Sequence, residues 1–357
     1  MDEDTKKTLL NKGTYTENLF GEKVRTDERS KLFEKFVIPP FSVLDTRSGY
    51  WQSRKRSWVK GLTIKSELGR KDTKAMGTWS GSVPGYYDKK AAVERELGEK
   101  LTPAEFEKEY LPKLLADSAL AFTDKGGILS IFDPVMCELA YRWFCPKEGE
   151  IADPFAGGSV RGIVANFLGY KYTGIDLNGE QIEENKRQGE AILGKDNMPT
   201  WITGNSLNID KLYKGKADFI FSCPPYFDLE QYTDDPTDLS NLSWEQFNKE
   251  YKQIIQKSCD LLKDNRFACF VVSEVRNRDT GEYRNLVGNT VKYFLEAGLS
   301  LWNELILLNT CGSVAMRVTR QFNISKKIGR IHQNILVFYK GNNQKNIRDI
   351  IVKDNEN

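Results

Sequence analysis

Short apolar runs alternate with amphipathic stretches of ten or more residues through the second half of the chain. The runs predict strands at residues 150–155, 171–177, 200–204, 218–223, 267–274, 301–308 and 334–340. Helices are expected between them at residues 159–168, 179–193, 243–263 and 285–297. Strands separated by helices of this length need right-handed crossovers, which give a mostly parallel sheet. The pattern therefore predicts an α/β fold. Its last two strands have no expected helix between them and should pair as an antiparallel edge.

The first 120 residues do not follow this pattern. They predict an N-terminal extension, followed by the α/β domain at residues 121–345 and a polar tail at residues 346–357. Within the extension, residues 91–120 indicate helix. Thr102-Pro-Ala-Glu105 has the N-cap, first-turn proline and acidic third position of a helix start.

Composition is that of a soluble globular protein, with 29% charged and 39% hydrophobic residues. No apolar run approaches the roughly 18 residues of a membrane span, so no membrane partner is expected. Six cysteines lie without Cys-x-x-Cys spacing, which favours reduced thiols in a cytoplasmic protein. With a single histidine, His332, a His-ligated zinc site or a Ser-His-Asp triad is hard to build, and no metal is expected.

A strand that ends in two prolines and an aromatic ring, Phe219-Ile-Phe-Ser-Cys-Pro-Pro-Tyr226, is the first candidate site. Open α/β sheets bind ligands at the carboxyl ends of their strands. Rigid carbonyls and a ring face there suit the exocyclic amino group of a flat heterocycle, because the carbonyls and a nearby polar atom accept its N–H bonds while the ring stacks. The expected catalytic residues are Ser222, Cys223, Pro224, Pro225 and Tyr226.

A second candidate, Ile151-Ala-Asp-Pro-Phe-Ala-Gly-Gly-Ser-Val160, runs from a strand into a turn of small residues. Glycines allow close approach of a ligand, and the following helix offers free N–H groups. Asp176 ends the next strand, where an acidic residue can take both hydroxyls of a ribose. A Rossmann dehydrogenase shares that arrangement. However, Asp-Pro-Phe replaces its Gly-x-Gly, and hydride transfer has no use for Cys-Pro-Pro-Tyr. An ordinary strand-to-helix turn is the other alternative.

Together these motifs resemble those of S-adenosylmethionine-dependent amino methyltransferases that act on DNA, over about residues 128–340. The resemblance implies a Rossmann-like seven-stranded fold with an antiparallel final strand and a catalytic domain at residues 121–345. It also implies S-adenosylmethionine as the cofactor and double-stranded DNA as the partner. The methyl group would go to N6 of adenine or N4 of cytosine in a flipped base. Residues 38–56 also resemble single-chain modification methylases of phages and prophages.

The resemblance carries over a set of cofactor-binding residues. These residues are Phe132, Pro134, Asp153, Phe155, Gly157, Gly158, Ser159, Asp176, Leu177, Asn205 and Ser206. Phe132 and Pro134 match a Phe-x-Pro motif that closes over the cofactor, and Asn205 would bond its adenine. Ser159 departs from the family pattern, because it replaces the last glycine of Asp-Pro-Phe-x-Gly-x-Gly.

Cys223 also departs from the family, which has Asp, Asn or Ser before Pro-Pro. In one interpretation Ser222 or a backbone carbonyl accepts the amino proton while Cys223 packs; by resemblance, Ser222 and the Pro224 carbonyl orient the amine. In a second, Cys223 is itself a weak acceptor. In a third, it is a nucleophile for methylation of a ring carbon. An exocyclic amine needs no covalent intermediate, only an accurate angle towards the methyl group.

Residues 228–238 follow directly, with five acids and no base. They are either an acidic surface loop or a loop that folds over the flipped base, with Tyr232 as a further stacking ring.

Two basic stretches are candidates for the DNA-binding surface. Residues 45–74 hold nine Lys/Arg against three Asp/Glu, interleaved with aromatic residues, and residues 311–332 hold five Lys/Arg and no acid. Cations suit phosphate and aromatic rings suit displaced bases, although such runs are also common on solvated faces. The expected contacts are Arg54, Lys55, Arg56, Arg317, Arg320, Lys326, Lys327 and Arg330.

Two rival functions remain open. One is a methyltransferase of the same fold for RNA or another amine, which a pocket without basic surroundings would favour. The other is a DNA-binding module that has lost turnover, which failure to bind S-adenosylmethionine would favour.

Overall fold

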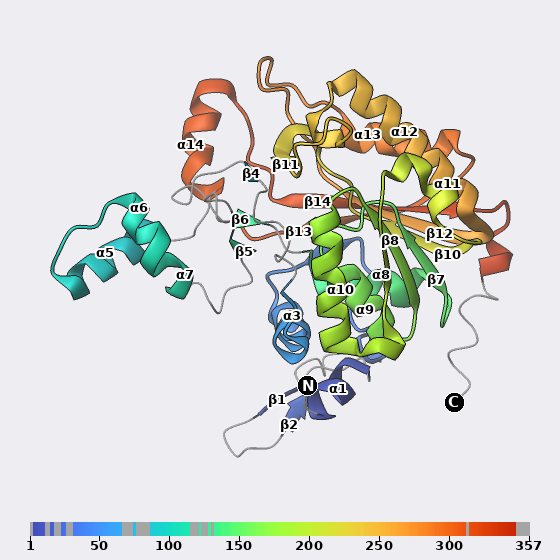
Figure 1. The fold of residues 1–357 in the computed structure, drawn as a ribbon, viewed down its shortest axis with the longest axis horizontal. Coiled ribbons are helices and arrows are strands. Elements are labelled where there is room, and N and C mark those ends of the chain that lie inside the picture. The colour runs from blue at the N-terminus through green and yellow to red at the C-terminus, as the bar shows by residue number, and fades with distance from the viewer. Residues whose placement is uncertain are drawn as a thin grey trace.

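A computed structural model of the chain describes residues 3–10, 15–17, 23–25, 31–65, 74–75, 86–114, 121–122, 128–129, 132–311 and 314–347. Figure 1 shows a twisted central sheet with helices on both faces. Its eight strands are, in spatial order, β3 (Val43–Asp45), β13 (Ser300–Leu308), β14 (His332–Lys340), β12 (Leu262–Val272), β10 (Ala217–Ser222), β7 (Glu150–Asp153), β8 (Lys171–Asp176) and β9 (Thr200–Thr203). Neighbours are parallel except around β14, which is antiparallel to both β12 and β13. The predicted α/β class with an antiparallel final strand is confirmed.

The sheet has one strand more than the seven expected. β3 pairs parallel with the end of β13, with Val43 opposite Ile306, and the Thr46 hydroxyl donates to the Leu308 carbonyl at 2.6 Å. β14 lies between β12 and β13, so the antiparallel pair is not the edge. A helix absent from the prediction, α14 (Val314–Ser325), connects β13 to β14. A three-residue strand such as β3 is too short to show a period of its own.

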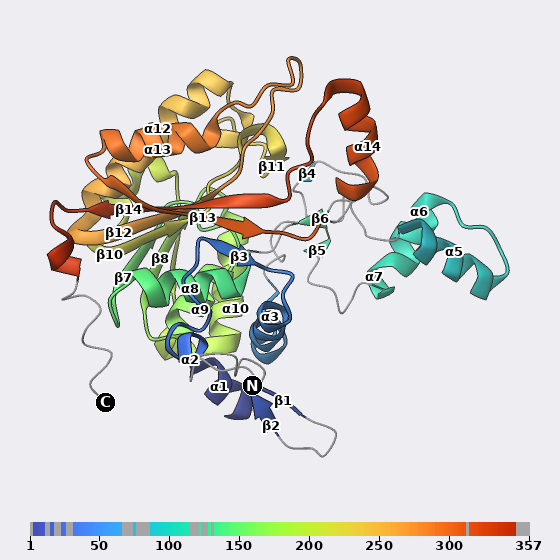
Figure 2. The ribbon, with the colours of Figure 1, turned by 180° about the vertical axis from the view of Figure 1, so that it is seen from behind.

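Two layers of helices enclose the sheet (Figures 1 and 2). One face carries α3 (Gly49–Leu62), α8 (Pro134–Phe144), α9 (Val160–Phe167) and α10 (Gly179–Leu193). The other carries α11 (Ile209–Leu212), α12 (Trp244–Leu261) and α13 (Leu286–Glu296). The predicted helix start at Ser243 is confirmed as a capping box with Gln246. Apolar side chains of the sheet and of the helices form a separate buried core on each face of the sheet.

Residues 31–65 are part of the first of these cores. Leu44 of β3 and Trp51 and Trp58 of α3 are buried among side chains of α8, α9 and the sheet. The predicted domain boundary at residue 120 is therefore wrong for this segment. Its basic composition suggested a surface extension, whereas its apolar residues complete the core.

A smaller group of helices has a core of its own. It consists of α5 (Tyr86–Leu97), α6 (Pro103–Glu105), a π-helical turn (Phe106–Tyr110) and α7 (Leu111–Leu114). Tyr86, Val93, Phe106 and Leu111 form that core, and the predicted capping box at Thr102 is present. Figure 1 shows this group set apart from the sheet.

The remaining described elements are short. They are α1 (Glu3–Leu10), β1 (Tyr15–Glu17), β2 (Lys23–Arg25), α2 (Lys31–Phe36), β4 (Lys74–Ala75), β5 (Ala121–Phe122), β6 (Ile128–Leu129), β11 (Glu230–Gln231) and several 3₁₀ turns. None of the described helices is long and apolar enough to cross a membrane. All six cysteines are free thiols, and Cys259 and Cys269 are buried in the core. The predicted tail at residues 346–357 lies almost entirely outside the described residues.

Candidate active site

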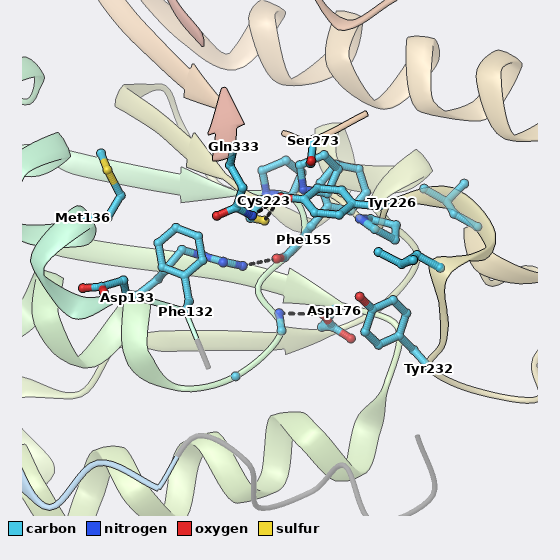
Figure 3. Close-up of a pocket in the computed structure, with 18 of the residues that line it drawn as sticks. Phe132, Asp133, Met136, Phe155, Asp176, Cys223, Tyr226, Tyr232, Ser273 and Gln333 are labelled. Atoms are coloured by element: carbon cyan, nitrogen blue, oxygen red, sulfur yellow. Dashed lines mark hydrogen bonds between the residues drawn. The ribbon is translucent and has the colours of Figure 1, made fainter. Parts of the chain in front are cut away.

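A cavity of about 870 Å³ lies at the carboxyl ends of β7, β8 and β10. In the sheet, β8 and β9 follow β7 on one side, whereas β10 and then β12 are added on the other side. The strand order therefore reverses between the neighbours β7 and β10. Ligands of open α/β sheets bind at this switch point. Both sequence motifs reach the cavity: Phe155 and Gly157 follow β7, and Cys223 and Tyr226 follow β10 (Figure 3).

Asp176 marks one end of the cavity, at the end of β8. Its carboxylate accepts the N–H of Gly157 at 2.7 Å and that of Asn178 at 2.9 Å. Gly157 has a φ of +50°, a left-handed conformation that favours glycine. Four more predicted residues line the cavity on this side: Gly158, Leu177, Asn205 and Ser206.

Asp153 and Ser222 are buried beneath the cavity instead of facing it. Asp153 accepts hydrogen bonds from Arg161 Nε at 2.6 Å, Tyr172 Oη at 2.7 Å and Ser222 Oγ at 2.6 Å. Because Ser222 is fully buried and donates its proton to Asp153, it is not placed to accept a proton from a bound amine. The predicted role of Ser222 is therefore wrong in this geometry, and Asp153 supports the site from below.

Arg161 is a site residue that the sequence analysis missed. Its guanidinium reaches Asp153 and also donates to the carbonyls of Phe155 and Ala156, which fixes the turn after β7. Burial alone would lower the pKa of Arg161, but the charge and hydrogen bond of Asp153, together with Tyr172 and Cys223, outweigh it and raise the pKa well above its usual value, so the group stays charged. Its Cζ lies 4.8 Å from the ring centre of Phe132, which lines the cavity. A basic residue just after the glycine turn was the available signal.

Two other predicted cofactor residues lie behind the cavity wall. Pro134 is the buried first residue of α8, which Asp133 caps. Ser159 is buried as well, and its hydroxyl donates to Gln188 at 3.0 Å. These residues shape the neighbouring turns, and direct contact with a ligand in the cavity is not supported for them.

The Cys-Pro-Pro-Tyr segment forms the opposite end, where Cys223, Pro224, Pro225 and Tyr226 all line the cavity. The Tyr226 hydroxyl lies 3.4 Å from Cys223 Sγ and accepts a hydrogen bond from Gln333 Nε2 at 2.7 Å. Burial, followed by the nearby Cys223, raises the pKa of the Tyr226 phenol well above its usual value, so the ring is neutral.

The backbone just after this segment is held by packing. Phe227 has a φ of +54°, which is unusual for a residue with a side chain. Its buried ring lies 5.1 Å from that of Trp244 and 5.4 Å from that of Phe247. These contacts keep the chain in the turn that directs residues 223–226 towards the cavity.

The acidic loop at residues 228–238 folds over the cavity. Tyr232, Thr233 and Thr237 line it, and Figure 3 shows the Tyr232 ring facing it. Asp238 is buried and accepts bonds from Thr233 and from Ser240, which fasten the loop. The loop has features of both interpretations, because Asp234 and Asp235 are exposed while Tyr232 lines the cavity; folding over a flipped base stays a prediction. Stacking by Tyr232 stays a prediction.

The first basic stretch divides between core and surface, because Arg54 alone of its described cations is buried. Arg54 is only 1% exposed, and its Nε and Nη2 contact the two oxygens of Glu138 at 2.8 and 2.5 Å. Its predicted contact with DNA is therefore wrong, because the guanidinium is enclosed. Lys55 lines the cavity and lies 3.1 Å from Asp133 Oδ2, and Arg56 is exposed. Residues 66–73 of this stretch lie outside the described residues.

The second basic stretch divides between surface and cavity. Arg317 and Arg320 on α14 and Lys326 after it are exposed, and Lys327 is half-buried. Arg330 lines the cavity, with its guanidinium on Ser273 Oγ at 3.1 Å, on the His332 carbonyl at 3.2 Å and on Asn334 Oδ1. Burial and, next, the charge of Arg330 lower the pKa of His332, which also lines the cavity.

Comparisons with known proteins add distant likenesses only. No protein-family model and no curated protein matches the sequence. Among solved structures, TrmN from Thermus thermophilus is 12% identical with a TM-score of 0.40, over 72% of this chain and 80% of that protein. A TehB-like SAM-dependent methyltransferase from Corynebacterium glutamicum is 15% identical with a TM-score of 0.37, over 67% of this chain and all of that one. Similarities this distant assign neither a substrate nor a family.

Proposed function

We propose that the protein transfers the methyl group of S-adenosylmethionine to the exocyclic amine of a base in double-stranded DNA, N6 of adenine or N4 of cytosine. One observation carries the proposal: a single cavity joins Asp176 and Gly157 at one end to Cys223, Pro224 and Tyr226 at the other. Its volume of about 870 Å³ is near the top of the range of about 300–1,000 Å³ for ligand sites. That leaves room for a nucleoside cofactor beside part of a second reactant.

The residues at the first end fit S-adenosylmethionine. Asp176 is positioned to accept the two ribose hydroxyls, while the glycine turn at Gly157 leaves room for the ligand to approach the backbone. Asn205 and Leu177 line the side where the adenine would lie, and Phe132 lines the wall nearest α8. When bound, the cofactor supplies an electrophilic methyl group on a sulfonium.

The second end supports an amine as the acceptor. Tyr226 and Pro224 both line the cavity. The Tyr226 ring would give a planar base an apolar face, and, as the resemblance implies, the Pro224 carbonyl would accept one of the two amine protons. Cys223 contacts the Tyr226 hydroxyl, a position that fits packing better than nucleophilic attack. The chain's own residues thus bind and orient the amine, and no covalent intermediate on Cys223 is required.

The choice of DNA draws support from the charge around the cavity. Arg330 lies in the wall, and its hydrogen-bond partners among the described residues are neutral oxygens, so a phosphate of the target nucleotide would complete its environment. Exposed Arg317 and Arg320 extend the positive charge along α14. Duplex RNA would meet the same cations, which makes RNA the second arm of the test.

The test is to incubate the protein with S-adenosylmethionine carrying a labelled methyl group, and with mixed duplex DNA, structured RNA or free nucleosides. Each product is digested to nucleosides and analysed by mass spectrometry. We expect label on N6-methyl-2′-deoxyadenosine or N4-methyl-2′-deoxycytidine of the DNA digest. Label in RNA alone would mean that RNA, not DNA, is the substrate. Label on carbon-5 of cytosine would mean that a ring carbon, not an amine, accepts the methyl group. Binding of DNA with neither cofactor binding nor methyl transfer would favour a DNA-binding module.

A further inference from the structure

An exocyclic base amine has two protons and a lone pair delocalised into the ring. Alkylation needs the lone pair directed at the methyl carbon, and acceptors for both N–H bonds favour that geometry. In this cavity the Pro224 carbonyl can serve one proton. A second acceptor is harder to find at residues 222–226, because Ser222 is buried on Asp153 and the Cys223 sulfur is a weak acceptor.

The sheet brings another polar side chain to this place. Since β14 is antiparallel, its first residues meet the carboxyl end of β12, which lies next to β10 in the sheet, and Asn334 lies opposite Val272, the last residue of β12. Side chains alternate along the strand, so Gln333 shares a face with Ile335 and Val337. Those two residues belong to the core against which Cys223 packs.

Contacts place the amide of Gln333 directly at the amine end of the cavity. Gln333 lines the cavity, and its Nε2 donates to the Tyr226 hydroxyl at 2.7 Å. That hydroxyl in turn contacts Cys223 Sγ at 3.4 Å, and Figure 3 shows Gln333 beside Cys223 and Tyr226. Among the described residues, none donates a hydrogen bond to Gln333 Oε1.

We infer that Gln333 accepts the second amine proton, so that a side chain from the final strand replaces the polar residue missing at position 223. This inference rests on the proposed function. In the reaction the nitrogen lone pair forms the new N–C bond, the S–C bond breaks with its electron pair left on sulfur, and one amine proton leaves to water. Gln333 holds the amine through its Oε1 and does not become protonated.

The test measures the rate at which the full-length protein methylates the DNA that the wild type modifies. Gln333→Leu should lower kcat by about tenfold or more, the equivalent of one hydrogen bond lost from the transition state. The dissociation constants for S-adenosylmethionine and for DNA should stay within about twofold. Gln333→Glu keeps an acceptor oxygen and should retain several times the kcat of Gln333→Leu.

Two further variants separate the acceptor role from simple support of Tyr226. Tyr226→Phe removes the hydroxyl that Gln333 holds, and it should cost less than Gln333→Leu. Cys223→Asn places an acceptor at position 223 and should restore kcat in the Gln333→Leu background. If Gln333→Leu and Tyr226→Phe cost the same and the double variant costs no more, Gln333 only holds Tyr226 and the inference is wrong.

The inference and the proposed function fail in different ways. A wild-type protein that methylates DNA, with Gln333→Leu equally active, overturns the role of Gln333 alone. A wild-type protein that methylates no nucleoside amine overturns the proposed function, and the role of Gln333 with it.

Discussion

The two basic stretches carry similar charge in the sequence but differ in the fold. On α3 the residues Trp51, Arg54, Trp58 and Leu62 recur every three or four positions and are buried together. Glu138 of α8 lies opposite and takes the Arg54 guanidinium, and the Trp58 indole also donates to it at 2.8 Å. Arg54 thus belongs to the apolar stripe of its helix.

The cations of α14 lie on the surface instead. Arg317 and Arg320 are exposed, and so are the large apolar residues Phe322 and Ile324. Figures 1 and 2 show this helix standing clear of the sheet. The comparison teaches that helical spacing together with a facing buried carboxylate separates a core cation from a surface one. The number of cations in a stretch does not.

The largest effect should come from Arg54→Gln. Removing the two-point Arg54 partner leaves the buried Glu138 with Arg142, 2.9 Å away, as its remaining ion-pair partner among the described residues, and should cost up to about 3–5 kcal/mol of folding free energy, measured by urea unfolding. The matched control is Arg56→Gln, two positions along the same helix and exposed, which should change stability by less than about 0.5 kcal/mol. If Arg54→Gln kept wild-type stability and lost affinity for DNA, α3 would be a binding surface and the comparison would be reversed.

The next effect concerns α14 and nearby Lys326. Replacing Arg317, Arg320 and Lys326 with Gln should make the slope of log affinity for DNA against log salt shallower by as much as about 2.7, from three lost phosphate contacts. The folding free energy should stay within about 0.5 kcal/mol, since these side chains are exposed.

A matched control removes three exposed charges far from the cavity, by Lys211→Gln, Lys214→Gln and Lys216→Gln at the entry to β10. It should leave the salt slope unchanged. An equal change in both triple variants would mean that only the net charge matters and that α14 is not a DNA-binding surface.

The smallest effect should come from Lys55→Gln, which tests whether Lys55 of α3 contacts the cofactor or DNA. Lys55 lines the cavity beside Asp133, so its loss should weaken S-adenosylmethionine binding by about 0.5–1 kcal/mol. Calorimetry measures this effect, with Arg56→Gln as the neighbour control. A change in the salt slope for DNA with no change in cofactor affinity would put Lys55 back on the DNA-binding surface.

Much of the α/β fold could be predicted, because its helices and inner strands are long enough to show their periods. β3 and α14 could not. The three residues of β3 depend on a partner strand more than 250 positions away, as Val43 pairs with Ile306. α14 exposes much of its surface, so the pattern of a buried face is weak. Tertiary contacts decide both elements.

The site residues likewise fall into those that the sequence predicted and those that it did not. Asp176, Gly157 and Tyr226 were predictable because each ends a strand or begins the turn after it. Ser222 was assigned to the wrong side, because neighbouring residues at a strand end face opposite ways and the sequence does not say which faces the ligand. Arg161 was missed because it lies one position beyond the glycine-turn motif, and Gln333 was missed because its strand carries no motif.

The central claim is that the cavity beside Asp176 binds S-adenosylmethionine, and calorimetry on Asp176→Ala tests it most directly. Loss of charge-assisted bonds to the ribose should weaken binding by about 1–3 kcal/mol. Tyr226→Ala, at the other end of the cavity, is the control: it should leave cofactor affinity nearly unchanged and lower turnover at least about tenfold. Unchanged cofactor affinity in a folded Asp176→Ala protein, or no binding by the wild type, would contradict the account.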